Sequence, residues 1–168
     1  SEYDPSKSTR SFTMMVSDYS LVTVIPKLVQ RVAQQAPQVK LNFTPQVIQP
    51  AIQVEQGGAD LVIAPGLYCS NDHPSEKLIV DPLVCVLDRD NPLVWSLDVE
   101  SLAQAEHVMM QPPGDGESYS LTALTKAGIT VDTAIRSYSF ASLPGLVRGT
   151  NRIAVVQSQL ARAMATGD

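Results

Sequence analysis

The side chains best suited to bind a small molecule occur where apolar segments end. Ser17, Asp18 and Tyr19 stand between a short apolar run and a segment with helical spacing. The first N–H groups of a helix, together with a hydroxyl, can receive a carboxylate or phenolate oxygen. Ser17 therefore either contacts a ligand oxygen or caps the helix. We assign Asp18 to capping, because a second negative group beside an anionic ligand would repel it.

A second group of candidates follows later apolar runs. Gln111 either hydrogen-bonds a ligand or simply opens a loop. Tyr138, Ser139 and Phe140 end another run, and an aromatic ring there could stack on a flat ligand. Packing in the core explains Phe140 equally well. Arg152 precedes the last run and either neutralises a carboxylate or lies on the surface.

The sequence gives little support to catalysis or metal binding. His73 and His107 each lack a second histidine or cysteine at ligand spacing, so we expect no metal. His107 could donate to an effector oxygen, but we assign it a surface or hydrogen-bonded structural role. There is no G-x-S-x-G elbow and no cysteine beside a strand-to-helix turn. We expect no enzyme activity and no cofactor. A hydrolase that uses Ser17 is kept only as a contrasting hypothesis.

The composition is that of a folded protein with no membrane span. Of the 168 residues, 44% are hydrophobic and 17% charged, which is enough apolar surface for a core. With 12 Lys and Arg against 17 Asp and Glu, the net charge of −5 gives poor electrostatic grounds for holding a phosphate backbone. The longest apolar runs reach about six residues, against the roughly 20 that a membrane-spanning helix needs.

Cysteine usage and the first residues indicate a cytoplasmic protein. Cys69 and Cys85 make neither a disulfide framework nor a zinc cluster, so free thiols are expected. Cys85 lies in an apolar run and is predicted to be a small core residue. The polar stretch 1–12 cannot serve as a secretory signal, although a mature form could have lost one.

Short apolar runs alternate with helical stretches from Ser11 onward, which predicts βαβ units and a mostly parallel sheet. If Thr23 is the N-cap of the first helix, Pro26 falls in the first turn. The backbone N–H groups of that turn have no acceptor within the helix, so a proline there removes no hydrogen bond. Gly57 or Gly58 closes a short helix in the left-handed conformation. The elements predicted in the first half are strands at Phe12 to Val16, Val39 to Phe43 and Leu61 to Ala64, and helices at Leu21 to Val32 and Pro50 to Gln56.

The second half repeats this rhythm after the run Leu83 to Leu87, which we interpret as a crossover strand. Ser118 and Ser142 are the predicted helix caps. The predicted strands are His107 to Gln111, Thr133 to Ser139 and Ile153 to Val156, and the predicted helices are Val99 to Ala105, Ser118 to Gly128, Ser142 to Gly149 and Gln157 to Ala165.

These elements predict an α/β protein of two doubly wound lobes, at 1–82 and 89–168, joined by the crossover strand at 83–88. The carboxyl ends of the strands would face a shared crevice, where ligands of such folds bind. No strand returns to the sheet of the first lobe, so we expect the C-terminal return segment to be missing and the chain to be a fragment.

The motifs resemble the effector-binding domain of LysR-type transcriptional regulators. That family has a strand ending in Ser-Asp before its first helix, an L-x-x-G-x-x-D-L-x-I segment and an L-V-x-G-x-x-I-A stretch. The matching segments are VSDYS at Val16 to Ser20, VEQGGADLVIAP at Val54 to Pro65 and LVRGTNRIAVV at Leu146 to Val156. The longer forms resemble the branch that holds the flavonoid-responsive nodulation regulator and the salicylate- and nitroaromatic-responsive regulators. Gln157 stands where many members have proline.

The resemblance implies two Rossmann-like lobes, as in type II periplasmic binding proteins, and a regulatory domain of an activator that binds a small, anionic, aromatic acid or phenolic effector. It implies self-association into a dimer or tetramer, contact with DNA only through an N-terminal winged helix-turn-helix outside these residues, and no membrane partner. It places effector contacts at the turn of Ser17 and in the stretch 138–140. The full set of candidate effector contacts is Ser17, Tyr19, Gln111, Tyr138, Ser139, Phe140 and Arg152.

One alternative shares this architecture. A stand-alone, periplasmic-type solute-binding protein would have the same two lobes and the same crevice. A signal peptide encoded upstream would favour it, and an upstream helix-turn-helix would exclude it.

Overall fold

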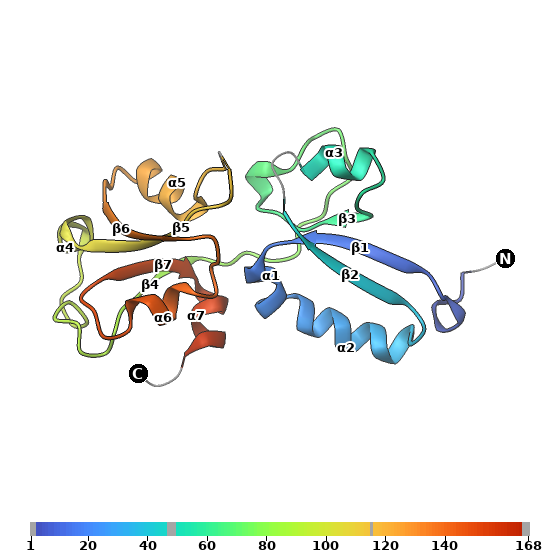
Figure 1. The fold of residues 1–168 in the computed structure, drawn as a ribbon, viewed down its shortest axis with the longest axis horizontal. Helices are drawn as coiled ribbons and strands as arrows, with labels where there is room; N and C mark the ends of the chain where they lie inside the picture. Colours follow the sequence, from blue (N-terminus) through green and yellow to red (C-terminus); the bar gives the residue numbers. More distant parts are fainter. Residues whose placement is uncertain (1–2, 47–49, 115, 166–168) are drawn as a thin grey trace. The chain divides into compact units, whose positions relative to one another are not determined.

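The chain forms two units, Ser1–Val80 and Asp81–Asp168, and each has its own sheet (Figure 1). We describe residues 3–46, 50–114 and 116–165 of a computed structural model. Helices and strands alternate along both units, as the alternation of apolar runs predicted. No helix within those ranges has the length and apolar content to cross a bilayer.

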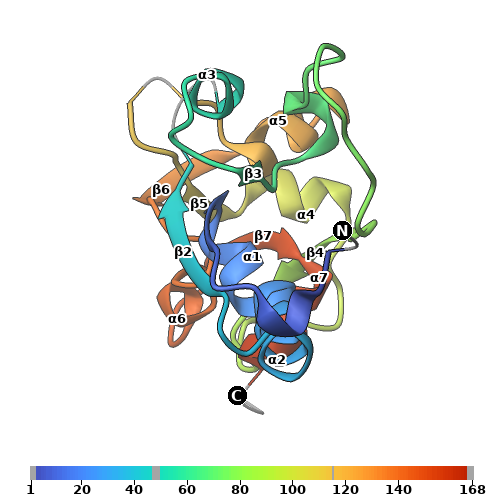
Figure 2. The same ribbon diagram turned by 90° about the vertical axis from the view of Figure 1, so that its right-hand side faces the viewer.

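The first unit is built on a three-stranded parallel sheet in the order β2-β1-β3. Helices α1 and α2 cover one face of this sheet and α3 covers the other (Figures 1 and 2). Its elements are a 3-10 helix at Pro5–Lys7, β1 (Ser11–Val16), α1 (Asp18–Thr23), α2 (Ile25–Gln35), β2 (Lys40–Pro45), α3 (Pro50–Glu55), β3 (Leu61–Val62) and a 3-10 helix at Gly66–Tyr68. The three predicted strands are confirmed, although β3 ends two residues earlier than predicted.

The core of the first unit explains why β1 is central. Met14 and Val16 are two residues apart, so their side chains leave the strand on the same face. They pack with Ile25 of α2, and Leu28, Phe43 and Ile63 surround them. Side chains from α2, from β2 and from the residue after β3 thus pack together on one face of β1. This packing holds α2 against the central strand.

The helix after β1 is where the sequence prediction was partly wrong. We expected one helix capped by Thr23, but the structure has two. The Thr23 hydroxyl donates to the Tyr19 carbonyl at 2.8 Å inside α1, and Val24 precedes α2 without a side-chain cap. Pro26 still falls in the first turn of α2, as expected. Val24 therefore separates α1, which begins at Asp18 just after β1, from α2.

The second unit has a four-stranded sheet in the order β4-β7-β5-β6, in which only the β4–β7 pair is antiparallel. Helices α4 and α5 lie on one face and α6 and α7 on the other (Figures 1 and 2). Its elements are β4 (Leu83–Val86), α4 (Val99–Gln104), β5 (Glu106–Met110), α5 (Tyr119–Lys126), β6 (Asp132–Ser137), α6 (Leu143–Val147), β7 (Ile153–Gln157) and α7 (Ser158–Met164). The segment interpreted as a crossover strand thus forms β4, paired within this unit.

The core of the second unit lies between its sheet and the α4–α5 layer. Met109, Leu124 and Val155 form the buried cluster, and the half-buried Leu83, Cys85, Leu102, Leu121, Ile129 and Val131 pack against it. Burial raises the pKa of the Cys85 thiol, which agrees with the core role predicted for it. Central β7 is buried at every position.

Glycines end two helices as predicted. Gly57 follows α3 with φ of +76°, so it, rather than Gly58, takes the left-handed conformation. Gly128 follows α5 with φ of +76°. A residue with a Cβ adopts this backbone conformation only at a cost, which is why both helices end where the sequence predicted.

Candidate functional site

Ser17 occupies the turn between β1 and α1 in the first unit. Its backbone is extended, and its hydroxyl oxygen accepts a hydrogen bond from the Ser20 N–H at 3.3 Å. Ser17 is therefore the N-cap, and our assignment of the cap to Asp18 was wrong, because Asp18 is already the first helical residue. Ser17 therefore carries its hydroxyl at the carboxyl end of β1, at the strand-to-helix junction that the sequence predicted.

A glutamine that sequence reasoning did not select lies at the same edge. Gln46 follows the last residue of β2, and its amide nitrogen donates to the carbonyl of Ile63, just beyond β3. Because β1 lies between these two strands, the Gln46 side chain joins the ends of the two outer strands beside Ser17. Tyr19 is half-buried in the first turn of α1.

Gln111 continues the pairing of β5 with β6 by one residue in the second unit. Its backbone N–H donates to the Ser137 carbonyl at 2.7 Å. Its side-chain nitrogen donates to the Gly116 carbonyl at 2.7 Å and so holds the loop that leads into α5. The amide nitrogen of Gln111, a predicted ligand contact, is thus already hydrogen-bonded within the protein.

A serine-rich turn follows β6. The Ser142 hydroxyl donates to the Ser139 carbonyl at 2.7 Å, and the Ser137 and Ser142 hydroxyls are also 2.7 Å apart. Ser142 precedes α6 as predicted, but its hydroxyl makes no capping bond to that helix, and its backbone is helical (φ −76°, ψ −24°) where a capping residue is usually extended. The turn is therefore held by its own side chains.

The turn separates the two aromatic candidates that precede α6. Tyr138 is 79% exposed, so its ring is accessible to a ligand. Phe140 is only 5% exposed and belongs to the packed interior. Of the two interpretations of Phe140, the structure favours core packing, and Tyr138 remains the ring that could stack on a flat molecule.

Gln157, the last residue of β7, is a second glutamine that sequence reasoning did not select as a contact. It is 6% exposed, and its side-chain oxygen is buried without a hydrogen-bond partner among the described residues. Buried polar atoms are rarely left unpaired. The available sequence signal was a polar residue at the end of an otherwise apolar strand, IAVVQ.

Arg152 lies at the other edge of this sheet. It directly precedes β7, and its Nε donates to Oε2 of Glu106, the first residue of β5, at 3.0 Å. Since β5 and β7 are parallel, this is the amino edge, whereas Gln111 and Gln157 lie at the carboxyl edge. The structure therefore does not bring Arg152 together with the other candidates of this unit.

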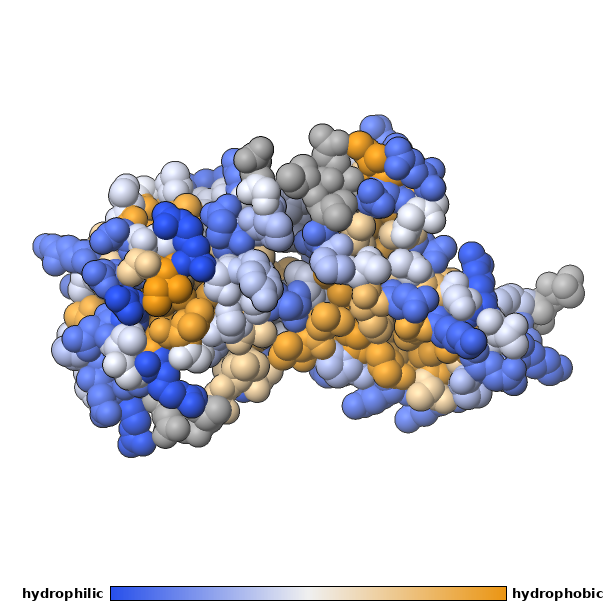
Figure 3. Space-filling view, in the orientation of Figure 1, coloured by the Kyte–Doolittle hydropathy of each residue, from blue (hydrophilic) through white to orange (hydrophobic). Residues whose placement is uncertain are grey.

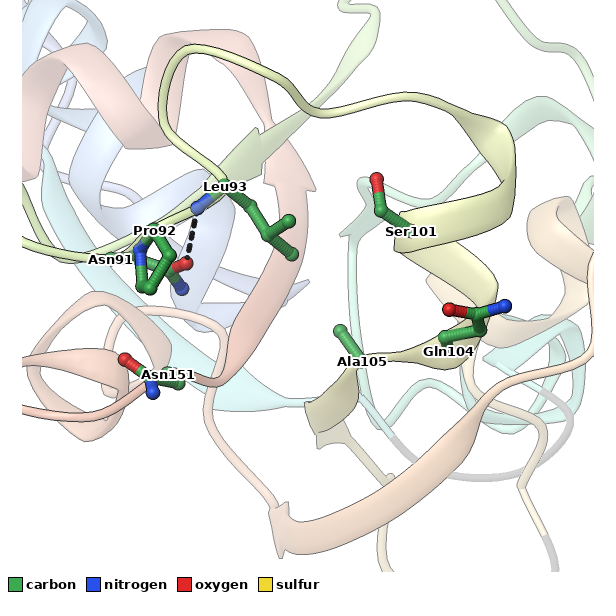
Figure 4. A pocket seen from close by; sticks show the side chains of 7 residues that line it. All are labelled: Asn91, Pro92, Leu93, Ser101, Gln104, Ala105 and Asn151. Atoms are coloured by element: carbon green, nitrogen blue, oxygen red, sulfur yellow. Dashed lines mark hydrogen bonds between the residues drawn. The ribbon is translucent and has the colours of Figure 1, made fainter.

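Two hollows open at that amino edge. One, of about 270 Å³, lies between the loop after β4, the helix α4 and Asn151 (Figure 4). The side-chain oxygen of Asn91 accepts from the Leu93 N–H at 2.9 Å and shapes its wall. The neighbouring hollow includes the Arg152–Glu106 pair. The residues that line the first hollow are Asn91, Pro92, Leu93, Ser101, Gln104, Ala105 and Asn151.

His107 has the hydrogen-bonded structural role that the sequence predicted as one alternative. It is fully buried at the start of β5, and its Nε2 lies 2.8 Å from the Leu102 carbonyl of α4. A carbonyl only accepts, so Nε2 carries the proton and the buried Nδ1 has no partner among the described residues. Burial lowers the pKa of this imidazole and keeps it neutral. Within the described ranges, no three His, Cys, Asp or Glu side chains gather as metal ligands.

The family of the chain follows from a match over almost its whole length. A family model described as the LysR substrate binding domain matches residues 6–168. The chain belongs to the LysR substrate-binding domain family. The family predicted from the motifs, and with it the α/β fold of two periplasmic-binding-protein-like lobes, is therefore confirmed.

Curated relatives of this LysR substrate-binding domain include Nodulation protein D 2 of Rhizobium leguminosarum bv. phaseoli, which is 31% identical over 159 residues. That match covers 90% of the chain and 48% of the relative, so the chain spans about half the length of the curated relatives it matches.

Solved structures that share the fold of this LysR substrate-binding domain include two from one organism. A probable transcriptional regulator of Pseudomonas aeruginosa has a TM-score of 0.84 at 20% identity, covering 98% of this chain and 57% of that one. The regulatory domain of MexT, a transcriptional activator in the same organism, has a TM-score of 0.63 at 19% identity, covering 94% and 76%.

Proposed function

We propose that this LysR substrate-binding domain is the effector-sensing part of a transcription regulator. The observation that carries the proposal is the family match across residues 6–168. Polar side chains at the carboxyl ends of the parallel strands in each sheet support it, because ligands of open α/β sheets bind at that end of the strands. The proposed contacts are Ser17 and Tyr19 in the first unit and Gln111, Tyr138 and Ser139 in the second.

The effector that we propose is a small aromatic acid or phenol. Tyr138 offers an exposed ring for stacking. The Ser17 hydroxyl donates to the Ser20 hydroxyl at 3.4 Å and would donate to a ligand oxygen in its place. The resemblance to the nodulation and salicylate branch supports the same class of compound. Phe140 and Arg152 are not part of the proposed site, since one is packed in the core and the other is paired at the opposite edge.

Calorimetric titration with benzoates, salicylates and flavonoids tests this proposal. We expect at least one of these classes to bind, and we expect Tyr138→Ala to weaken its binding about fivefold to tenfold through loss of ring stacking. Arg152→Ala is the matched control and should leave the affinity unchanged. Its ion pair is largely solvated, so stability should change by less than about 1 kcal/mol. Absence of binding at millimolar concentrations by the whole protein would contradict the proposal.

The domain would act on transcription through the rest of the protein. We place DNA contact in an N-terminal winged helix-turn-helix outside these residues, which agrees with the acidic charge of this chain. An effector shifts the whole protein between two arrangements on DNA only if it binds one of them more tightly. This function requires a cytoplasmic protein and no turnover, and the family match gives no support to a stand-alone solute-binding protein or to a hydrolase.

We further propose that the first unit supplies a surface for self-association. Among the residues that the structure describes, β2 pairs with β1 alone and leaves the outer edge of its sheet open. Hydrophobic colour gathers over β2 and α2 in Figure 3, and Val29 on α2 is 42% exposed. An open strand edge beside an apolar helix face is a ready site for pairing with a second copy.

Val29→Glu tests this surface by placing a charge within it. We expect the dissociation constant of the dimer to rise at least about tenfold, because an interface residue that carries a charge would lose its apolar contacts. Analytical ultracentrifugation measures it, with Val99→Glu on the second unit as the control, since Val99 is also exposed. Identical sedimentation of both variants and the unchanged protein would argue against the surface.

A further inference from the structure

We propose that Gln157 is a specificity-determining residue that accepts a hydrogen bond from a hydroxyl of the effector. The inference deepens the proposed function, on which it rests, because it states which group the effector must carry.

The side-chain amide of Gln157 is buried, and its oxygen lacks a hydrogen-bond donor among the described residues. The residue is 94% buried, since only 6% of it is exposed, and its side-chain oxygen finds no partner among the described residues. A buried acceptor without a donor destabilises the state that contains it. A ligand that brings a donor to this oxygen would remove that penalty, so binding would be strengthened by more than the hydrogen bond is worth in water.

Gln157 is the last residue of β7, and its pairing with β4 determines which face of the sheet its side chain occupies. Leu83 of β4 lies directly opposite Gln157, and side chains of opposite residues leave a sheet on the same face. Leu83 packs in the cluster with Val155, two residues before Gln157 on the same strand. The Gln157 side chain therefore lies on the α5 face of the sheet, at its carboxyl edge.

The first turn of α5 borders this position. Ser120 in that turn donates its hydroxyl hydrogen to the Val155 carbonyl at 2.8 Å, so the turn lies against the end of β7. Ser118 caps the helix by accepting from the Leu121 N–H. The hydroxyl hydrogen of Ser120 is thus already used, and the Gln157 oxygen has no donor among the described residues.

The surroundings of Gln157 determine the chemistry of the ligand. Gln111 follows the neighbouring strand β5, and its amide nitrogen already donates to the Gly116 carbonyl. An oxygen acceptor favours a hydroxyl over a hydrogen atom and over a methoxy group, which is of similar size but cannot donate. We therefore infer that the effector is a hydroxylated aromatic compound.

Titration of the whole domain with benzoate, the three hydroxybenzoates and the matching methoxybenzoates tests this inference. We expect one hydroxy isomer to bind at least about tenfold more tightly than benzoate and at least about tenfold more tightly than its methoxy counterpart. Only the hydroxy compound can donate a hydrogen bond to the buried oxygen of Gln157. In Gln157→Leu this preference should fall to within about twofold, while benzoate itself binds as before.

Two further measurements separate a binding role from a structural one. Gln104→Leu changes an exposed glutamine at the opposite edge and should keep the preference. In a nitrogen-edited NMR spectrum, the side-chain amide signal that is absent from Gln157→Leu should shift on addition of the preferred hydroxy acid and not of benzoate. This readout uses the unchanged protein and does not depend on the folding of the variant.

Each outcome decides the question. An unchanged preference in Gln157→Leu, or equal affinity of the unchanged domain for benzoate and all hydroxybenzoates, overturns the role of Gln157 but leaves the proposed effector function standing. Tighter binding of methoxy than of hydroxy compounds also overturns it. If none of these acids and no flavonoid binds, the proposed function fails as well.

Discussion

Replacing Met109 by alanine is expected to lower the free energy of unfolding of the second unit by about 2–5 kcal/mol, the range for removing most of a buried large side chain. Met109 is 1% exposed and lies in the cluster with Leu124 and Val155, between the sheet and α5. The surrounding helix and strand cannot fully collapse onto an alanine, so a cavity remains and adds to the lost burial. Urea unfolding measures the change.

Amide hydrogen exchange measures which strands lose stability in Met109→Ala. Because each unit has its own buried cluster, Met109→Ala should reduce the protection of amides in β5 and β7 and leave those in β1 and β2 unchanged. Met14→Ala should have the reverse effect. Val99→Ala, at an exposed position, is expected to change stability by less than about 0.5 kcal/mol. Equal loss of protection in both units after Met109→Ala would show that they unfold as one.

The second large effect is a pH dependence that comes from His107. Burial lowers the pKa of this imidazole below its ordinary value of 6.5, although its bond to the Leu102 carbonyl acts in the opposite direction. Above that ordinary value, folded and unfolded chains both hold a neutral His107 and stability is complete. As the pH falls below it, the unfolded chain binds a proton that the folded chain does not, so stability is lost by up to about 1.4 kcal/mol per pH unit until the folded pKa is reached.

Unfolding in urea between pH 7.5 and 5 checks this dependence. His107→Gln removes the titration and retains a donor able to reach the Leu102 carbonyl, so its stability should be nearly flat over the same range. The matched control is His73→Gln, which leaves His107 as the remaining histidine and should keep the slope. The carboxylates whose pKa values are lowered, Asp4, Asp88 and Asp98, lose their stabilising contribution only at lower pH. A slope that survives in His107→Gln would exclude this histidine as its source.

Local features of the fold could be predicted because they depend on residues close in sequence. The strand at Ser11–Val16 follows from its apolar run, and the helix ends near Gly57 and Gly128 follow from the need for a left-handed residue. The family motifs predicted the fold class for the same reason, since they record turns and strand ends. The choice of Ser17 over Asp18 as the cap was missed, because both residue types cap helices equally well and the end of β1 selects between them.

By itself, the sequence determined the alternation of strands and helices, the family and the residues at most strand ends, although it predicted one helix in place of α1 and α2. Only the tertiary structure decided which of those residues belong together. Strand direction placed Arg152 at the amino edge with Glu106, and packing buried Phe140 while leaving Tyr138 exposed. The unpaired oxygen of Gln157 is also a property of the fold, since burial and hydrogen-bond partners depend on neighbours that lie far apart in the chain. Residue type limits what a side chain can do, but its surroundings in three dimensions decide what it does.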